Sequence, residues 1–365
     1  MTDTKKDLKR ECLEYDMDNT QTSSGLIGLV NLGNTCYMNT VIQCLVHTLP
    51  LKDLFMDDNY KKHLNEESRN RIFALQWENL VNHMWNPKKG ISSLCPKNFV
   101  RLNQVISQKM VKDGKLTSSF KIGEQHDMAE YLQFVLDIIH DSLSCQVSMN
   151  YEGNIRTRLD KLMVESYSNF KRHFQKDYSF IIDLFCGQYF TQIVTCDNIA
   201  TSEHSENFDP FTVLTLCLPN KKKECTLYEC LDIMILDDFI DGWKGDIIEK
   251  SRKIKKNQYL WKLPNILIIH IKRFSNQFQK NNCGVQIVHQ LNLQKYCKGY
   301  DSCNSKYTLY AVGNHVGNLH FGHYFADCFV KHLGWYRFDD TKVTNINKNE
   351  LNSNSAYILF YKKDN

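Results

Sequence analysis

The sequence predicts an α+β fold in which helices pack against a largely antiparallel sheet. Apolar residues recur at helical spacing up to about residue 180, and short segments rich in aromatic and β-branched residues follow. The 365 residues are 42% hydrophobic and 12% aromatic, enough for a packed core. Six prolines, no repeat and no low-complexity segment leave no obvious linker, so we expect one large domain after a mobile tail at residues 1–24.

The first predicted helix follows the small polar residues in the stretch GLVNLGNTCYMNTVIQ. Apolar side chains at the spacing i, i+3, i+4 and i+7 form one helix face: Ile42, Leu45, Val46 and Leu49. This spacing predicts a helix from near Cys36 to Thr48. Pro50 is expected to stop it, and Asn34 and Thr35 are the candidate caps at its start.

Cys36 would then lie in the first helical turn, where unpaired N–H groups and the positive end of the helix dipole stabilise a thiolate. On this stretch alone, a buried cysteine that acts as a small hydrophobe is an equal alternative. The chain has fourteen cysteines and no apolar signal or membrane-spanning stretch, so we expect free thiols in a cytoplasmic or nuclear protein. Only Cys225 and Cys230 approach the spacing of a zinc-binding pair, which does not favour a metal.

The clearest helix is HDMAEYLQFVLDIIHDSL, whose apolar stripe includes Met128, Leu132, Val135 and Ile139. The predicted strands follow in the second half of the chain, at 187–196, 211–218, 265–274, 307–315, 323–330, 335–340 and 356–363. The polar stretch at 221–257 is the candidate for an insertion.

His323 begins one predicted strand after a Gly-containing loop, and the next strand ends in Asp339 and Asp340. With a turn near 331–334, antiparallel pairing brings these carboxylates near the imidazole, with the register open by two or three positions. Either aspartate could orient His323, although a histidine at a strand start is often a polar edge residue. Because a nucleophilic thiolate needs an imidazole partner, Cys36 and His323 are candidates for covalent catalysis.

The charge pattern indicates no polyanionic partner. The formal net charge of +4 is small for this length, and the basic runs KKK at 221–223 and KSRKIKK at 250–256 lie apart. We interpret both runs as solvated loops or faces rather than a nucleic-acid site or a nuclear-import signal. We therefore expect neither nucleic acid nor membrane as a partner.

Four ordered motifs resemble those of the ubiquitin-specific protease family. GLVNLGNTCYMNTVIQCL is similar to the family's cysteine box, and YTLYAVGNHVGNLHFGHYFADCFV with GWYRFDD and AYILFYKK is similar to its histidine box. Between them, GEQHDMAEYLQFVLDIIHDSL resembles its Gln-Gln-Asp helix and LPNILIIHIKRF its Leu-Pro strand. The resemblance covers about residues 25–363. It implies a papain-like fold with a helical thumb, a palm and antiparallel β fingers, as one catalytic domain at 25–365 with the fingers inserted at roughly 187–262.

The family hydrolyses the isopeptide or peptide bond after the C-terminal glycine of ubiquitin. Matched by position, the resemblance implies that Cys36 is the nucleophile, that His323 is its general base and then acid, and that Asp339 orients His323. Asp340 could assist or substitute for Asp339. Asn31 would donate a hydrogen bond to the oxyanion, although a turn residue held by its own side chain is the alternative.

The resemblance also implies contacts with the tail of ubiquitin. Gln125 and Asp127 match tail-contacting residues, although Asp127 could equally favour the N-terminus of its helix. The loop at 314–322, which includes His315 and Gly322, matches a loop that borders the tail channel. Its glycines would let it move when ubiquitin binds.

The chain departs from the family in its fingers. Cys196 matches the first zinc ligand of many members, but Ile199 occupies the second position and the other cysteine pair is missing. We therefore expect no metal and no cofactor, and ubiquitin capture that is weaker or depends on an activating partner. His126 replaces the second Gln of the helix motif, and Phe321 stands where glycine is commoner.

The leading hypothesis is a deubiquitinating thiol protease that acts on ubiquitin and ubiquitinated proteins through an acyl-enzyme. The alternatives are a protease for a ubiquitin-like modifier and a catalytically idle ubiquitin-binding adaptor. The presence of Cys36, Asn31, His323 and Asp339 together speaks against the idle adaptor.

Overall fold

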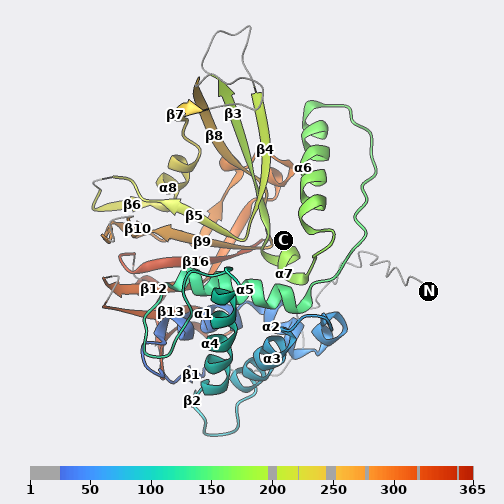
Figure 1. The fold of residues 1–365 in the computed structure, drawn as a ribbon. Coiled ribbons are helices and arrows are strands. Elements are labelled where there is room, and N and C mark those ends of the chain that lie inside the picture. Colours follow the sequence, from blue (N-terminus) through green and yellow to red (C-terminus); the bar gives the residue numbers. More distant parts are fainter. Residues whose placement is uncertain are drawn as a thin grey trace, which may run out of the picture. The chain divides into compact units, whose positions relative to one another are not determined.

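The structure is a computed structural model that describes residues 25–195, 204–220, 222–243, 252–275, 279–318, 321–351 and 353–364. The predicted tail at 1–24 lies outside these residues, and so does Cys196, which matches a zinc ligand of other family members. The chain divides into two compact units that alternate along the sequence. The first comprises 1–151, 174–182 and 310–351, and the second comprises 152–173, 183–309 and 352–365 (Figure 1).

The first unit begins with helices around a short parallel strand pair. Its elements are β1 (Gly28–Leu29), α1 (Cys36–Val46), α2 (Leu49–Met56), α3 (Arg71–Trp85), β2 (Ser93–Leu94), α4 (Lys97–Lys112) and α5 (Met128–Leu143). Every residue of α1 is buried. This helix packs against α5 on one side and against β13 (Gly322–Val330) on another, so it is the centre of the unit's core.

The predicted first helix is correct in its start and wrong in its end. The helix α1 begins at Cys36 but ends at Val46, before Thr48. Pro50 does not stop it, because Pro50 occupies the first turn of α2, where a missing N–H is tolerated. Thr35 is the N-cap of α1 but makes no side-chain capping bond, since its hydroxyl accepts a hydrogen bond from the Leu32 N–H instead.

The strands of the first unit form an antiparallel ladder. The part of β12 (Lys306–Gly317) from residue 310 onward pairs with β13, which pairs with β14 (Gly334–Asp339), which pairs with β15 (Lys342–Ile346). The turn between β13 and β14 lies at 331–333, as predicted. Ala326 lies opposite Phe338 and Asp327 opposite Arg337, so the register that the sequence leaves open is fixed.

The second unit is mainly β. It contains α6 (Arg158–Phe174), β3 (Gly187–Thr195), β4 (His204–Phe211), β5 (Val213–Cys217), β6 (Glu224–Thr226), α8 (Leu227–Met234), β7 (Asp238–Trp243), β8 (Arg252–Lys262), β9 (Ile266–Lys272), β10 (Gly284–Gln286), β11 (Gln290–Asn292) and β16 (Ala356–Lys363). An antiparallel sheet has the order β4-β3-β8-β7. In addition, β9 pairs antiparallel with β16 and parallel with β5. The helix α7 (Phe180–Phe185) crosses the boundary between the units.

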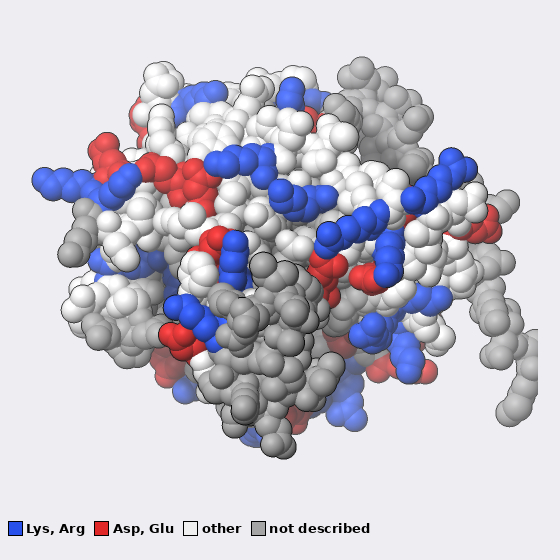
Figure 2. All heavy atoms as spheres, turned by 90° about the horizontal axis from the view of Figure 1, so that it is seen from above, with Lys and Arg blue, Asp and Glu red and all other residues white. Residues whose placement is uncertain are grey.

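Within the described residues, the polar stretch at 221–257, the candidate insertion, contains β6, α8, β7 and the first part of β8. Part of its second basic run lies in β8, where Lys255 forms an ion pair with Asp237 at 2.7 Å across the ladder to β7. Basic and acidic side chains are interspersed on the face drawn in Figure 2. Among the helices in the described ranges, none combines the length and the apolar character needed to cross a membrane.

An ion pair between a buried carboxylate and a partly exposed guanidinium ties three strands of the first unit together. The Arg337 guanidinium donates to both carboxylate oxygens of Asp327, at 2.7 and 3.0 Å, and the Asn314 amide donates to the same carboxylate at 3.0 Å. The Asp327 side chain is fully buried, and burial raises its pKa, a shift that Arg337 opposes. The charged carboxylate therefore depends on its partners in β12 and β14.

We predict that Arg337→Met destabilises the protein by about 3–5 kcal/mol, because it leaves a buried carboxylate without its counter-ion. Urea unfolding of the variant and of the wild type would measure the loss. The double variant Asp327→Leu with Arg337→Met should recover most of it, since no buried charge then remains. Equal stability of wild type and Arg337→Met would contradict the role given to this pair.

Candidate active site

The start of α1 is fixed by polar side chains inside the core. The Gln43 amide donates to the Ile27 carbonyl at 2.8 Å, and the Asn39 amide donates to the Leu29 carbonyl at 3.3 Å. Both amides are buried and one helical turn apart, so they hold the strand segment along the helix. As a result Cys36, which is 3% exposed, is presented in the first turn of α1 next to unpaired backbone N–H groups.

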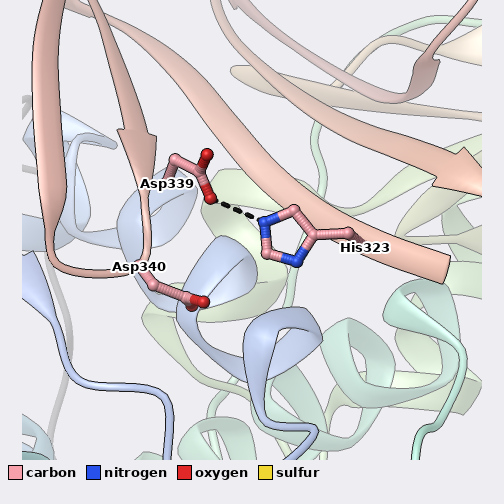
Figure 3. Close-up of side chains that lie close together, drawn as sticks. All are labelled: His323, Asp339 and Asp340. Carbon is pink, nitrogen blue, oxygen red and sulfur yellow. Dashed lines mark hydrogen bonds and ion pairs between the residues drawn. The ribbon is translucent and has the colours of Figure 1, made fainter.

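The ladder between β13 and β14 brings His323 and Asp339 together. When the observed register is continued by one pair, Phe325 comes opposite Asp339, and His323 two residues earlier shares the same face. His323 Nε2 lies 2.6 Å from Asp339 Oδ1 (Figure 3). This hydrogen bond makes Nε2 the protonated nitrogen and leaves Nδ1 for another partner.

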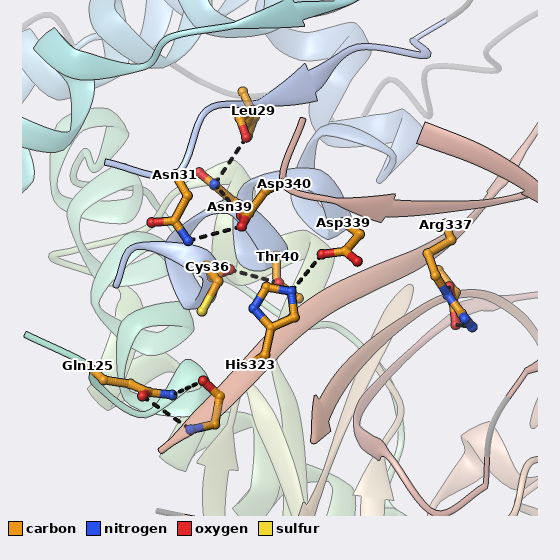
Figure 4. Close-up of polar contacts among 12 residues, drawn as sticks. Leu29, Asn31, Cys36, Asn39, Thr40, Gln125, His323, Arg337, Asp339 and Asp340 are labelled. Atoms are coloured by element: carbon orange, nitrogen blue, oxygen red, sulfur yellow. Dashed lines mark hydrogen bonds and ion pairs between the residues drawn. The ribbon is translucent and has the colours of Figure 1, made fainter. Parts of the chain in front are cut away.

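The second partner of the imidazole is Cys36. Figure 4 shows the Cys36 sulfur beside the His323 ring, on the side opposite Asp339. The interaction with Cys36, followed by the hydrogen bond to Asp339, raises the pKa of His323 to about 9 against the opposing effect of burial. A thiol, an imidazole and a carboxylate thus form one continuous line of contacts.

Asp340, expected either to assist Asp339 or to substitute for it, has hydrogen-bond partners of its own. Its carboxylate accepts hydrogen bonds from the Asn31 amide at 3.0 Å and from the Asn39 amide at 2.8 Å (Figure 4). Its backbone carbonyl accepts from the Leu29 N–H at 2.8 Å. Because Asp340 contacts three residues around the start of α1, it clamps the segment that carries Cys36 rather than substituting for Asp339 on His323.

Close backbone approach supports this clamp. Gly28 packs so tightly that an added Cβ would lie 2.5 Å from the Thr341 carbonyl oxygen, which only glycine avoids. Asp340 itself has a positive φ of 49°, a conformation that aspartate tolerates better than most residues. The loop between β14 and β15 therefore packs directly against the backbone of β1.

Asn31 is oriented as an amide donor toward Cys36. Its Oδ1 atom accepts hydrogen bonds from the Gly33 N–H at 3.0 Å and the Thr35 N–H at 3.1 Å. These bonds fix which end of the amide carries nitrogen, so the NH₂ group faces Asp340 and the side of Cys36 (Figure 4). The turn interpretation and the donor interpretation of Asn31 are thus compatible, because its oxygen holds the turn and its nitrogen keeps a second hydrogen for a ligand.

The predicted substrate contacts have protein partners. The Gln125 amide donates to the Gly322 carbonyl at 2.9 Å, directly before His323. Asp127 caps α5 by accepting from the Ala129 and Glu130 N–H groups. His315 is 1% exposed and packs against Tyr324, with ring centroids 4.5 Å apart and ring planes tilted by 40°. The role of these residues in binding stays a prediction, and His315 could reach a ligand only after a rearrangement.

One group in the described ranges has donor atoms close enough to hold a metal ion, namely His323, Asp339 and Asp340. Each of them already bonds to protein groups: His323 and Asp339 to each other, and Asp340 to two side-chain amides. This donor set is therefore better explained by hydrogen bonding than by a metal site. Where the cysteines lie in described residues, they are free thiols.

The fold and this site define a class: an α+β papain-like protein with a Cys–His–Asp constellation, the arrangement of thiol proteases. Residues 27–361 match the family model described as ubiquitin carboxyl-terminal hydrolase. The chain belongs to this family.

Two relatives illustrate the sequence similarity. The chain is 32% identical over 383 residues to ubiquitin carboxyl-terminal hydrolase 4 of Saccharomyces cerevisiae strain RM11-1a, covering 95% of this chain and 39% of the relative. It is 32% identical over 359 residues to ubiquitin carboxyl-terminal hydrolase Usp2 of Drosophila melanogaster, covering 94% of this chain and 35% of the relative. The chain thus spans less than half the length of these two relatives.

A solved structure confirms the fold. The chain resembles part of the SAGA Ubp8/Sgf11/Sus1/Sgf73 DUB module bound to ubiquitin aldehyde, with a TM-score of 0.68 and 24% identity. The match covers 95% of this chain and 71% of that chain.

Sequence reasoning missed Asn39 as part of the site. The available signal was an amide at position 39 and another at position 43, on one side of a stretch that is otherwise apolar or small. Buried amides in such a helix need partners, which here are the backbone of β1 and the Asp340 carboxylate.

We predict that an NMR titration of the His323 imidazole gives a midpoint at about pH 9, and that Cys36→Ala lowers it because the largest cause of the shift is lost. The folded-state pKa lies above the usual value of 6.5, so protonated His323 stabilises the fold below about pH 6.5, and this contribution disappears as the pH rises through about 9. Cys186→Ala, which removes a buried thiol of the second unit, should leave the midpoint unchanged. A midpoint that is the same in wild type and Cys36→Ala would refute the contact.

Proposed function

We propose that the protein is a deubiquitinating thiol protease that hydrolyses the isopeptide or peptide bond after the C-terminal glycine of ubiquitin. The observation that carries this proposal is the alignment of Cys36, His323 and Asp339 in a chain of the ubiquitin carboxyl-terminal hydrolase family. The likeness to a module bound to ubiquitin aldehyde supports ubiquitin as the modifier.

The geometry suits a two-step acyl transfer. The Cys36 sulfur attacks the carbonyl carbon of the terminal glycine while His323 holds the thiol proton, and His323 then donates a proton to the leaving amine. A thioester joins ubiquitin to Cys36 until water attacks it, with His323 as the general base. Asp339 keeps the imidazole oriented and stabilises its charged form through the bond to Nε2.

Charge that develops on the carbonyl oxygen needs donors. In our proposal, Asn31 supplies one N–H and the backbone at the start of α1 supplies others. Asp340 and the Asn31 turn fix the direction of this amide before substrate arrives. Asp340 is thus a positioning residue for the oxyanion site.

The wider expectations from the sequence remain part of this proposal. We propose that the fingers expected at roughly 187–262, within a catalytic domain at 25–365, include the sheet β4-β3-β8-β7. Ubiquitin and ubiquitinated proteins are the proposed partners, together with an activating protein. A cytoplasmic or nuclear location agrees with the free thiols of the described cysteines.

A covalent probe tests the function. Purified protein is incubated with ubiquitin that carries a C-terminal electrophile, and intact mass is measured beside Cys36→Ala. We expect one ubiquitin added to wild type and none added to the variant. An adduct with a ubiquitin-like modifier but not with ubiquitin would show that the protein is a protease for that modifier instead. Binding of ubiquitin without any adduct would support the catalytically idle adaptor.

We predict that Asp339→Ala lowers kcat more than Asp340→Gly does. Glycine keeps the positive φ at position 340, so Asp340→Gly removes only the carboxylate that holds Asn31 and Asn39. Turnover of a fluorogenic ubiquitin substrate measures both effects. If Asp340→Gly lowered kcat more than Asp339→Ala did, Asp340 rather than Asp339 would be the aspartate on which turnover mainly depends.

We also predict that Asn31→Ala lowers kcat by about 100- to 1000-fold, the usual loss when one oxyanion donor is removed. The reaction of Cys36 with a small alkylating agent should change little, because that reaction forms no oxyanion. If both rates fell together, Asn31 would act by holding the cysteine loop rather than by donating to the oxyanion.

A further inference from the structure

The residue before His323 is held by a side chain from a distant part of the first unit. Gln125 lies in the segment that precedes α5. Its amide donates to the Gly322 carbonyl at 2.9 Å, and the Gly322 N–H donates to its Oε1 atom at 3.4 Å (Figure 4). A residue paired in a neighbouring antiparallel strand would make the same two bonds in opposite directions. The side chain of Gln125 thus takes the place of a strand partner for Gly322.

Gly322 is a residue whose conformation needs such a restraint. It begins β13, and an added Cβ at this position would lie 2.2 Å from Nε2 of His315, which is buried. Glycine is therefore required here, although it has the widest backbone freedom of all residues. The pairing of β13 with β14 starts at Ala326, three residues after His323. The backbone just before His323 thus depends on contacts from elsewhere in the unit.

The bond to the Gly322 carbonyl acts directly on the backbone of His323. This carbonyl belongs to the peptide group that joins Gly322 to His323, and a peptide group is planar. When its oxygen is held, the plane is held, and so is the direction in which the His323 side chain leaves the strand. That direction decides whether the imidazole meets Asp339, whose Oδ1 atom lies 2.6 Å from Nε2, and Cys36 on its other side (Figure 4).

The segment that carries Gln125 is itself anchored. The Gly123 N–H donates to the Gly33 carbonyl at 2.9 Å, and the Asn34 amide donates to the Gly123 carbonyl at 2.8 Å. Beyond Gln125 the segment leads into α5, whose N-terminus is capped. Gly33 and Asn34 belong to the loop that leads into Cys36. Gln125 therefore connects the loop of the cysteine to the strand of the imidazole.

We propose that Gln125 is a positioning residue for His323. By holding the peptide group before His323, its amide keeps the imidazole in line between the Cys36 sulfur and Asp339. The consequence for turnover rests on the proposed function. The family resemblance implies a different role for Gln125, a contact with the tail of ubiquitin. The two roles differ in their kinetics, because loss of a positioning contact lowers kcat, whereas loss of a tail contact raises KM.

The first test uses Gln125→Met in the full chain, which keeps the length of the side chain and removes both hydrogen bonds. Turnover of a fluorogenic ubiquitin substrate gives kcat and KM separately. We expect kcat to fall by about 10- to 100-fold, up to the loss that a misplacement of about 1 Å causes, with KM nearly unchanged. An unchanged kcat would overturn the proposal, and a higher KM would then make Gln125 a tail contact.

The second measurement needs no turnover, so it separates this inference from the proposed function. The imidazole of His323 is titrated by NMR, where the wild type should have a midpoint at about pH 9. We expect Gln125→Met to lower this midpoint, because an imidazole out of line loses the contacts that raise its pKa. An unchanged midpoint would overturn the proposal even if kcat fell. A lower midpoint in a protein that does not cleave ubiquitin would uphold it while the proposed function failed.

Gln133→Met is the matched control. Gln133 lies in α5, is also partly buried, and donates its amide to Asp137 of the same helix at 2.7 Å. This variant should leave kcat and the His323 midpoint unchanged. Equal losses in Gln133→Met and Gln125→Met would overturn the proposal, since the effect would then not depend on Gly322.

A second variant covers the case in which Gln125→Met does not fold, which circular dichroism would reveal. Gln125→Asn keeps an amide but is one methylene shorter, so it cannot hold both polar groups of Gly322 at the observed distances. We expect a lower kcat and a lower His323 midpoint, as for Gln125→Met. Wild-type values of both in a folded Gln125→Asn variant would overturn the proposal.

Discussion

The register between β13 and β14 is the constraint on which the rest of the site depends. A side chain alternates between the two faces of a strand, so only one set of registers places His323 and Asp339 on the same face and within reach. The hairpin turn at 331–333 and the ion pair between Asp327 and Arg337 both select the observed register. The same residues that stabilise the ladder therefore orient the imidazole.

The loop that follows β14 connects this ladder to the nucleophile. Asp339 bonds to His323, and its neighbour Asp340 bonds to Asn31 and Asn39 beside Cys36. The two adjacent carboxylates therefore have separate roles: Asp339 orients the imidazole, and Asp340 holds the segment that carries Cys36. The segment that carries Cys36 and this loop are about 300 residues apart in sequence. The site therefore forms only when the unit folds, and no local motif is sufficient for it.

Much of the fold can be predicted from periodicity, and the reasons for the failures are physical. The helix at 128–143 and the strands at 322–330 and 356–363 have strong apolar patterns that sequence reasoning detects. Periodicity alone misses the strands β7 and β8, which fall in the region where the family resemblance implies antiparallel fingers, because their charged residues hide the pattern. It also misplaces Pro50, because a proline can begin a helix as well as end one. For the site, residue type and order indicate Cys36 and His323, whereas the separate partners of Asp339 and Asp340 depend on a register and a turn conformation that local sequence does not fix.

The most direct test of this constraint is the turnover of a fluorogenic ubiquitin substrate by two insertion variants. One alanine inserted between Phe338 and Asp339 changes the face on which Asp339 lies, while one alanine inserted beside Leu333 lengthens only the turn. We expect the strand insertion to remove nearly all turnover and the turn insertion to keep most of it. An active strand-insertion variant would contradict the claim that the register of β13 and β14 assembles the site.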